Sequence, residues 1–376
     1  MINSLLYIVW NADPEMFTIP GINWPVRWYG LLFAVAFVGS QFVMNKIYKT
    51  ELRSQKDLDI LTLYIILGTV LGARLGHVLF YQPEMIFEDP LSIIKIWEGG
   101  LASHGGAIGI ILAMWLYCRK TKENWRWIFD RLIIVVALSG MCIRTGNLMN
   151  SEIIGKPTDA SYGVVFVNPL SERMKTEDIY KEVLDGNIKS ISFSKTNKDT
   201  VFGNTPATEL EVTVTTNQAL SASYAGILAE RIQDYHERAL RRGENHIFIN
   251  PVTLNANSSA QTLDTFRFKI YGIPRHAAQI YEAIYCLFLF LFFYYLWAKK
   301  RDKFPQLFIF GLFCVLLFTE RFFDEMLKEN QVEFEDTMKF NMGQILSIPF
   351  VIIGAGMMIW SKRKNIFHQL PDKRKE

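Results

Sequence analysis

The chain has 376 residues, of which half are hydrophobic and 14% are aromatic, and its formal net charge is only +3. So small a charge gives no reason to expect a nucleic-acid partner. The hydrophobic residues occur in long runs, which is not how a soluble protein distributes them.

The first twenty-odd residues differ from the rest of the chain in composition. They have no positively charged start and contain Asp13, Pro14, Glu15 and Pro20, so they do not resemble a cleaved signal peptide. We expect this stretch to be an interfacial segment on the outer face of a membrane.

Seven stretches of mostly apolar residues follow, each long enough for a helix that crosses a bilayer, which takes about 20 such residues. They cover residues 28–48, 58–80, 101–118, 128–149, 277–298, 304–327 and 342–360. The sequence therefore predicts a polytopic α-helical membrane protein with seven transmembrane helices.

Positive residues are concentrated in alternate loops. Basic residues follow the first, third and fifth stretches and fill the C-terminal tail, whereas the loops between 81 and 100 and between 328 and 339 lean acidic. By the positive-inside rule, the N-terminus lies outside and the C-terminus is cytoplasmic. The basic residues are Lys46, Lys49, Arg53, Lys56, Arg119, Lys120, Lys122, Arg126, Lys299, Lys300, Arg301 and Lys303.

The four cysteines all fall inside or at the ends of the apolar stretches, where no oxidising compartment could pair them. They are Cys118, Cys142, Cys286 and Cys314. We interpret them as small packing residues.

A polar insertion separates the fourth and fifth stretches, at residues 156–275. Runs rich in β-branched residues predict strands at 162–167, 191–194, 209–216, 246–254 and 265–272, and residues 221–243 predict one amphipathic helix. The predicted topology makes this an extracytoplasmic α+β domain. The chain then divides into 1–155 with the first four helices, the 156–275 head domain, and 276–376 with helices 5–7 and the basic tail.

Polar residues gather near one level of the predicted bundle. A helix rises ~1.5 Å per residue, so Arg74 lies ~16 residues, or about 24 Å, above the inner end of its helix. Arg144 and Arg321 come out at similar heights, and His104 falls in the first turn of the third helix. Tyr29, Tyr281, Glu282 and Gln344 also lie near outer helix ends. Because these side chains share one height, we expect them to converge in the outer half of the bilayer. Ionisable residues at that depth usually serve a function.

Each residue also has a simpler interpretation. Arg74 alone could snorkel to lipid headgroups, Arg321 and Glu325 could form a plain helical ion pair, and His104 alone could be a structural histidine. The glycine pairs on either side of His104, which include Gly105 and Gly106, allow a bend or a close approach of another group. Arg144 is more telling, because Asn147, Asn150 and Glu152 follow it within two turns.

These residue types favour binding of a phosphate. The guanidinium groups of Arg144 and Arg321 can each form paired hydrogen bonds to phosphate oxygens, and His104 can accept a proton near neutral pH. We find no serine-nucleophile motif, glycine-rich phosphate loop, metal-binding HExxH or finger-like Cys/His spacing, and we predict no cofactor and no metal. The residues alone thus indicate a lipid-phosphate site facing the outer leaflet. A lipid-headgroup-binding transporter or receptor remains the alternative, although no repeated half is visible.

Several segments, in this order, resemble the bacterial phosphatidylglycerol–prolipoprotein diacylglyceryl transferases. The similar segments are VRWYGLLFAVAF, LGARLGHVLFY, KIWEGGLASHGGAIG, IRTGNLMNSEIIGK, PRHAAQIYEA, ERFFDE and NMGQILSIP. The IRTGNLMNSEIIGK segment resembles the family signature G-R-x-G-N-F-x-N-x-E-x-x-G. Together they cover nearly all of the predicted membrane portion.

The resemblance implies transfer of the sn-1,2-diacylglyceryl group from phosphatidylglycerol to the lipobox cysteine of a preprolipoprotein signal peptide. It implies a multi-pass protein of the bacterial inner membrane, with membrane lipid and signal peptides as its partners. By this resemblance Arg144 and Arg321 bind the headgroup, supported by Asn147, Glu152, Gly155 and Glu325, and His104 is the candidate base. The wider substrate-binding set is Tyr29, Arg74, Gly105, Gly106, Asn147, Asn150, Glu152, Gly155, Tyr281, Glu282 and Glu325.

The chain departs from the family pattern at five positions. The leading glycine and the phenylalanine of the signature are Ile143 and Leu148, and the proline and serine after His276 are both alanine. A tyrosine common one turn before the second arginine is Leu317. The hydroxyl of that tyrosine is therefore either absent or supplied by another residue.

Overall fold

The computed structural model describes residues 7–21, 24–95, 100, 102–176, 188–202, 205–221, 227, 230, 247–249, 262–329, 335 and 337–368. Its long helices are α1 (Trp28–Thr50), α2 (Gln55–Tyr81), α4 (Ser103–Thr121), α5 (Trp125–Met149), α9 (Ala278–Lys300), α10 (Phe308–Asp324) and α11 (Met342–Lys364). The shorter helices are α3 (Met85–Glu88), α6 (Asn168–Thr176), η1 (Pro90–Ile94) and η3 (Arg301–Lys303). The strands are β1 (Ile8–Trp10), β2 (Glu15–Ile19), β3 (Trp24–Arg27), β4 (Val164–Phe166), β5 (Ile188–Phe202), β6 (Thr205–Ser221), β7 (Ile247–Ile249) and β8 (Thr262–Gly272).

Each of the seven apolar stretches overlaps one of the long helices. Five helical segments in the described part of the chain are long and apolar enough to cross a membrane: α1, α2, α5, α11, and α9 together with η3. Helix α10 is shorter, with 17 residues. The prediction of a polytopic helical membrane protein is thus confirmed, whereas the count of seven spans stays a prediction.

Contacts divide the chain into two compact units. Unit 1 comprises Met1–Phe33, Cys142–Ile284 and Arg321–Ile345, and unit 2 comprises Ala34–Met141, Tyr285–Glu320 and Leu346–Glu376. Unit 1 therefore contains strands β1–β8 and short end segments of α1, α5, α9, α10 and α11. The division into 1–155, 156–275 and 276–376 follows chain order instead, and it stays a prediction.

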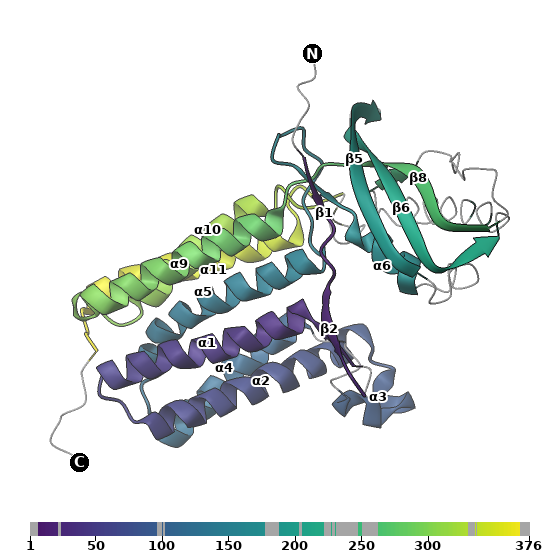
Figure 1. The fold of residues 1–376 in the computed structure, drawn as a ribbon. Helices are drawn as coiled ribbons and strands as arrows, with labels where there is room; N and C mark the ends of the chain where they lie inside the picture. The colour runs from purple at the N-terminus through teal and green to yellow at the C-terminus, as the bar shows by residue number, and fades with distance from the viewer. Residues whose placement is uncertain are drawn as a thin grey trace. The chain divides into compact units, whose positions relative to one another are not determined.

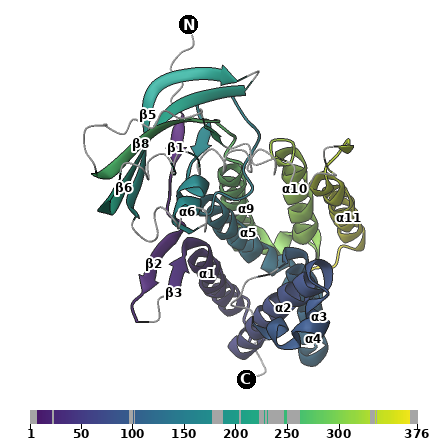
Figure 2. The same cartoon turned by 90° about the vertical axis from the view of Figure 1, so that its right-hand side faces the viewer.

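In unit 2 the long helices lie side by side (Figures 1 and 2). Ile47, Ile134, Leu289 and Phe293 are fully buried in their shared apolar core. Helices α2 and α4 approach each other through glycines, so that a Cβ atom on Gly72 would lie only 2.5 Å from the Gly105 carbonyl oxygen. Small residues allow helices to pack this closely. In lipid the hydrophobic effect does not drive helices together, so their association depends on such close packing.

Buried carboxylates tie several of these helices together, and the sequence analysis did not single them out. Glu51 accepts hydrogen bonds from the indole nitrogens of Trp127 (2.5 Å) and Trp297 (2.7 Å), and from Arg131 Nε (2.7 Å). Asp130 accepts the N–H groups of Leu307 (2.7 Å) and Phe310 (2.9 Å). Asp130 thereby satisfies donors at the start of α10 that have no partner within the helix.

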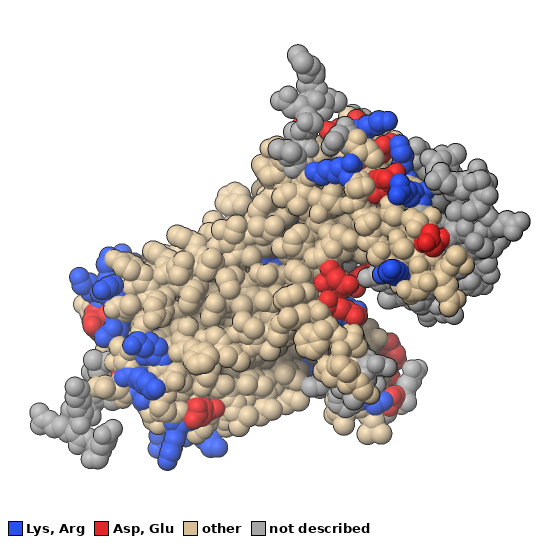
Figure 3. All heavy atoms as spheres, viewed as in Figure 1, with Lys and Arg blue, Asp and Glu red and all other residues tan. Residues whose placement is uncertain are grey.

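The surface of unit 2 separates charge from apolar side chains. Basic residues occupy the last turns of four helices, and Figure 3 shows lysine and arginine gathered at that end while the helix sides carry few charges. These basic residues are Lys49, Arg119, Lys120, Lys299, Lys300, Lys362, Arg363 and Lys364. Large apolar residues such as Phe42, Ile111 and Ile352 are exposed on the helix sides, as expected of surfaces that face lipid. Cys142, Cys286 and Cys314 are buried, and Cys118 is half-buried.

Unit 1 contains a four-stranded antiparallel sheet in the order β5-β6-β8-β7. Figures 1 and 2 show its strands β5, β6 and β8 side by side. From Leu210 to Thr216 every second residue of β6 is buried, with Leu210, Val212 and Val214 at 0% exposure, which is the alternation expected of a strand with one covered face. All five strand segments predicted in the insertion overlap strands, although residues 246 and 250–254 lie outside the described residues. The predicted 221–243 helix falls almost entirely outside them too.

The N-terminal segment forms strands that the sequence analysis did not predict. Strand β1 pairs with β4 in parallel, and β2 pairs with β3 as an antiparallel hairpin. Met16, Phe17 and Trp24 of the hairpin are about half exposed. Three to five residues are too few to produce a hydrophobic period, which explains why the pattern escaped prediction.

Candidate active site

The end of α5 folds the chain back toward the helix. Ser151 has a left-handed backbone (φ 52°), its N–H donates to Leu148 O (3.1 Å), and the Glu152 N–H donates to Asn147 O (2.9 Å). This is the hydrogen-bond pattern of a Schellman motif. The turn returns the Glu152 carboxylate to the helix end, where it accepts hydrogen bonds from the side-chain amides of Asn147 (3.0 Å) and Asn150 (3.1 Å). Three predicted site residues thus form one hydrogen-bonded group.

Arg144 lies one turn before this group, and its side chain is 18% exposed. Its Nη1 donates to Asn147 Oδ1 (3.4 Å), and its Nε lies 2.9 Å from Oε2 of Glu282 on α9. These two contacts use Nε and Nη1. A guanidinium carries five N–H donors, so it can make further hydrogen bonds to a ligand. The guanidinium is therefore oriented by two side chains and retains hydrogen-bonding capacity.

Arg321 and Glu325 lie four residues apart at the end of α10. Arg321 Nη2 is 3.5 Å from Glu325 Oε1, and the Arg321 side chain is 40% exposed. The helical ion pair considered from the sequence is therefore present. Glu325 is less exposed, at 11%. A single helical ion pair at this distance is weak, so it does not occupy all the N–H groups of Arg321.

The start of α11 fixes the position of Glu325. Asn341 Oδ1 accepts the Gln344 N–H (2.9 Å), and Gln344 Oε1 accepts the Asn341 N–H (3.2 Å), which is the reciprocal arrangement of a capping box. Asn341 Nδ2 donates to Glu325 Oε2 (3.3 Å). A Cβ atom on Gly343 would lie 2.5 Å from Glu325 Cδ, so the carboxylate lies directly against the α11 backbone.

Lys328 lies among three carboxylates, those of Glu282, Asp324 and Glu325, and it is not one of the residues predicted from the sequence. Its side chain is 2% exposed, and its Nζ lies 2.9 Å from Glu282 Oε1, 3.0 Å from Asp324 Oδ2 and 3.1 Å from Glu325 Oε1. Burial lowers the pKa of the Lys328 ammonium, but the nearby carboxylates outweigh burial and raise this pKa above its usual value. Its spacing of three and four residues from two acidic residues was the sequence signal that could have revealed it.

Gly155 is enclosed by two other segments of unit 1. Its N–H donates to His276 O (2.9 Å), and its carbonyl accepts a hydrogen bond from Arg275 Nη1 (3.1 Å). A Cβ atom at this position would lie 2.5 Å from His276 O and 2.9 Å from Leu327 O. No side chain fits there unless the backbone moves.

The two predicted tyrosines are also placed in unit 1. The Tyr29 ring packs against α5, since a Cβ atom on Gly146 would lie 2.8 Å from Tyr29 Cδ2. The Tyr281 hydroxyl lies 3.3 Å from His276 Nδ1, and burial lowers the pKa of the His276 imidazole. Tyr29 thus contacts the helix that carries Arg144 and Asn147, and Tyr281 contacts the residue whose carbonyl accepts the Gly155 N–H.

In unit 2, Arg74 holds the segment that follows α2. Its side chain is buried, Nε donates to Ile93 O (3.0 Å), and Nη1 donates to Gly100 O (3.3 Å). The guanidinium therefore binds backbone carbonyl groups rather than pointing along the helix toward headgroups.

His104 lies at the start of α4 and is exposed. Its ring contacts Phe80 and Tyr81, with centroids 5.1 Å and 5.8 Å away. Gly105 packs against α2, whereas a Cβ atom on Gly106 would have no neighbour closer than 3.6 Å. Of this glycine pair, Gly105 is the one that the close helix approach requires.

The predicted site residues divide between the units. Ten belong to unit 1, namely Tyr29, Arg144, Asn147, Asn150, Glu152, Gly155, Tyr281, Glu282, Arg321 and Glu325, and four belong to unit 2, namely Arg74, His104, Gly105 and Gly106. Among the described residues, no group of three or more His, Cys, Asp or Glu side chains is arranged to hold a metal ion.

The surroundings of Leu317, where the family commonly has a tyrosine, show which hydroxyl is nearby. Leu317 packs against the core of unit 2, and the Tyr285 hydroxyl donates a 3.0 Å hydrogen bond to the neighbouring Leu316 carbonyl. A hydroxyl therefore does reach this turn of α10, from α9.

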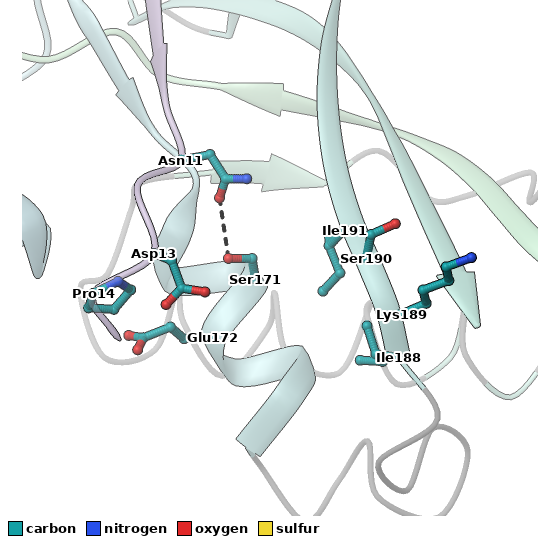
Figure 4. Close-up of a pocket in the computed structure, with 9 residues that line it drawn as sticks. All are labelled: Asn11, Asp13, Pro14, Ser171, Glu172, Ile188, Lys189, Ser190 and Ile191. Carbon is teal, nitrogen blue, oxygen red and sulfur yellow. Dashed lines mark hydrogen bonds between the residues drawn. The ribbon is translucent and has the colours of Figure 1, made fainter. Parts of the chain in front are cut away.

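Unit 1 also holds a cavity of about 270 Å³, which no predicted site residue lines. Figure 4 shows the carboxylates of Asp13 and Glu172 on one side of this cavity and β5 on the other.

Comparison with known proteins gives consistent matches along the chain. Residues 14–360 match the model of the family described as prolipoprotein diacylglyceryl transferase. Relatives named phosphatidylglycerol–prolipoprotein diacylglyceryl transferase include proteins of Tolumonas auensis (34% identity over 95% of this chain and 98% of the relative) and Bacteroides fragilis (33% over 97% and 100%). One from Porphyromonas gingivalis is 30% identical over 97% of this chain and 98% of its own length.

These alignments run across the 156–275 insertion as well as the helices, so the likeness is not confined to the membrane portion. The chain belongs to the prolipoprotein diacylglyceryl transferase family.

Proposed function

We propose that this protein transfers the sn-1,2-diacylglyceryl group of phosphatidylglycerol to the lipobox cysteine of preprolipoproteins, the first step of lipoprotein maturation. The observation that carries the proposal is the pair of arginines, Arg144 and Arg321, which unit 1 holds on buried or half-buried carboxylates. Guanidinium groups bind phosphate oxygens through paired, charge-assisted hydrogen bonds. Family membership connects that phosphate to phosphatidylglycerol.

The reaction exchanges one bond for another at the glycerol carbon that bears the phosphate ester. The lipobox thiol gives its proton to a base, and the thiolate attacks this carbon. A C–S bond forms while the C–O bond to phosphate breaks, and the electron pair leaves on the phosphate oxygen of glycerol phosphate. Arg144 and Arg321 stabilise the charge that develops on this oxygen.

The other predicted residues have supporting roles. Asn147, Asn150 and Glu152 orient Arg144 and the headgroup. Tyr29 and Tyr281 line the headgroup site. His104 is the candidate base for the thiol, because an imidazole can accept a proton near neutral pH. Arg74, Gly105 and Gly106 complete the proposed substrate-binding set.

We further propose that the chain crosses the bacterial inner membrane seven times, with its N-terminus outside and its C-terminus in the cytoplasm. The basic last turns of α1, α4, α9 and α11 support this orientation. In this topology the insertion is extracytoplasmic and the active site faces the outer leaflet. This topology divides the chain into three consecutive domains, residues 1–155, 156–275 and 276–376.

The test is diacylglyceryl transfer by the purified protein in vesicles that contain labelled phosphatidylglycerol, with a lipobox peptide as acceptor. Wild-type protein should produce a thioether-linked peptide, and Arg144→Ala should lower the rate about 10²- to 10³-fold, as loss of a group that stabilises developing charge does. Circular dichroism and size exclusion establish that the variant is folded. Wild-type protein that forms no product with both substrates present would refute the function.

A cysteine-to-serine lipobox peptide separates transfer from mere binding. Transfer requires the thiol, so this peptide should give no product. A protein that binds phosphatidylglycerol and both peptides equally well, without forming a thioether, would instead be a lipid-binding receptor or transporter.

A further inference from the structure

Five charged side chains of unit 1 form a row of alternating sign. The order is Arg144, Glu282, Lys328, Glu325 and Arg321, and the ion-pair distances between neighbours are 2.9, 2.9, 3.1 and 3.5 Å. Helix α5 carries the first residue, α9 the second and α10 the last, Arg321, whereas Glu325 and Lys328 lie in the segment just after α10. Lys328 is therefore the link between the two arginines.

The two carboxylates of the row are shared between cations. Glu282 places Oε2 on Arg144 and Oε1 on Lys328, and Glu325 places Oε1 on both Lys328 and Arg321. A carboxylate engaged by Lys328 has fewer lone pairs to offer an arginine. Each guanidinium is thereby oriented without being fully neutralised.

The charge count of this cluster depends on Lys328. With Asp324, which also contacts Lys328 at 3.0 Å, the cluster holds three cations and three carboxylates. Without Lys328 it would hold two cations and three carboxylates. The unpaired carboxylates would then draw Arg144 and Arg321 into tighter pairs and would repel an incoming phosphate.

We propose that Lys328 is a positioning residue for phosphatidylglycerol, because it holds Glu282 and Glu325 so that Arg144 and Arg321 keep hydrogen-bonding capacity for the phosphate. This inference rests on the proposed transferase function. Lys328 itself touches no substrate. It is 2% exposed, so it acts only through the two carboxylates.

The test measures kcat and the apparent KM for phosphatidylglycerol, expressed as its mole fraction in mixed micelles. Lys328→Met keeps the length of the side chain but removes its charge. We expect it to raise this KM about tenfold or more, equivalent to ~1.4 kcal/mol of binding, with a smaller effect on kcat. Lys328→Arg keeps the charge, and we expect its KM to lie within about threefold of wild type.

Lys156→Met is the matched control. Lys156 adjoins the same segment, since its N–H donates to Leu327 O, but its Nζ donates to the Met326 carbonyl. The control therefore removes the same charge from the same region without freeing a carboxylate. Its KM for phosphatidylglycerol should stay within about twofold of wild type.

Charge compensation separates positioning from simple structural support. Adding Asp324→Asn to Lys328→Met restores equal numbers of cations and carboxylates, so the double variant should recover much of the lost affinity. A merely structural lysine predicts a double variant as impaired as the single one, or more. If Lys328→Met does not fold, Lys328→Gln takes its place, since it is neutral yet keeps N–H donors.

Three results would overturn the proposal: an unchanged KM in folded Lys328→Met, a double variant no better than Lys328→Met, or an equal rise of KM in Lys156→Met. Wild-type activity distinguishes this failure from that of the proposed function. An active wild type with an unaffected Lys328 variant rejects only the role of Lys328, whereas an inactive wild type rejects the transferase itself.

Discussion

At the scale of single residues, Gly155 shows most directly how backbone geometry shapes the site. It joins the loop after α5 to the segment before α9, and a methyl group there would lie 2.5 Å from the His276 carbonyl oxygen. We expect Gly155→Ala to shift this loop and lower the transfer rate about 10²-fold, since displacing catalytic groups by about 1 Å has effects of that size. Initial rates with labelled phosphatidylglycerol measure the change.

Gly30→Ala is the control for this substitution. A Cβ atom on Gly30 would meet no atom within 4 Å, so its rate should match wild type. Equal rates for both variants would mean that the enclosure of Gly155 does not matter for transfer.

The sequence revealed some of these residues and not others, for physical reasons. Arg144, Asn147, Asn150 and Glu152 stand out because polar groups are costly next to an apolar helix. Lys328 did not, because it follows the apolar stretch and looks like an ordinary loop lysine. Its burial depends on acidic residues from two helices, and one of these, Glu282, lies far away in the sequence.

At the scale of elements, the start of α11 sets the position of Glu325. Gly343→Ala would place a Cβ atom 2.5 Å from Glu325 Cδ and 2.8 Å from its Oε1, so the carboxylate would have to move. We expect the apparent KM for phosphatidylglycerol to rise about three- to tenfold, because a displaced Glu325 no longer orients Arg321 for the phosphate.

Gly356→Ala lies in the same helix and meets no atom within 4 Å, so it controls for the glycine-to-alanine change within α11. The kinetic constants of the two variants, measured side by side in mixed micelles, test the idea. A Gly343→Ala enzyme with wild-type KM would show that Glu325 can move without consequence.

The sheet of unit 1 carries a buried carboxylate with a predictable pH response. Glu209 on β6 accepts hydrogen bonds from Thr196 on β5 (2.8 Å), and from Lys269 (3.1 Å) and Tyr271 (3.2 Å) on β8. Burial raises the pKa of the Glu209 carboxyl, but these hydrogen bonds outweigh burial and leave the pKa below its ordinary value of 4.5. The ionised carboxylate therefore stabilises the folded sheet.

This stabilisation is complete above the unfolded pKa of 4.5 and is lost as pH falls through the lower folded pKa. We expect hydrogen-exchange protection of β6 and β8, corrected for intrinsic exchange rates, to decline below about pH 4.5. Glu209→Gln should lower protection at neutral pH and flatten the decline. Glu211→Gln is the control, since within the described residues its carboxylate accepts no hydrogen bond, and an identical pH response in both variants would contradict the assignment.

The elements were predictable to different degrees. Long apolar stretches are helical because a bilayer core leaves backbone groups no other partner, so all seven were visible in the sequence. The pairing of β1 with β4 was not, since it joins three-residue strands far apart in the chain. The close approach of α2 and α4 was only partly visible: the glycines around His104 indicated a close neighbour but not which helix it was.

At the scale of the whole molecule, the charge pattern makes a topological prediction. Lys198 lies exposed on β5 and Lys364 lies exposed at the end of α11. In a variant with its four cysteines replaced by alanine, we expect a membrane-impermeant maleimide to label Lys198→Cys in intact spheroplasts. Lys364→Cys should be labelled only after the membrane is permeabilised, because in the proposed orientation the basic end of the helices faces the cytoplasm. Diacylglyceryl transfer by each variant shows that the labelled protein is native. Labelling of Lys364→Cys in intact spheroplasts would reverse the orientation, and with it the placement of the arginine site toward the outer leaflet.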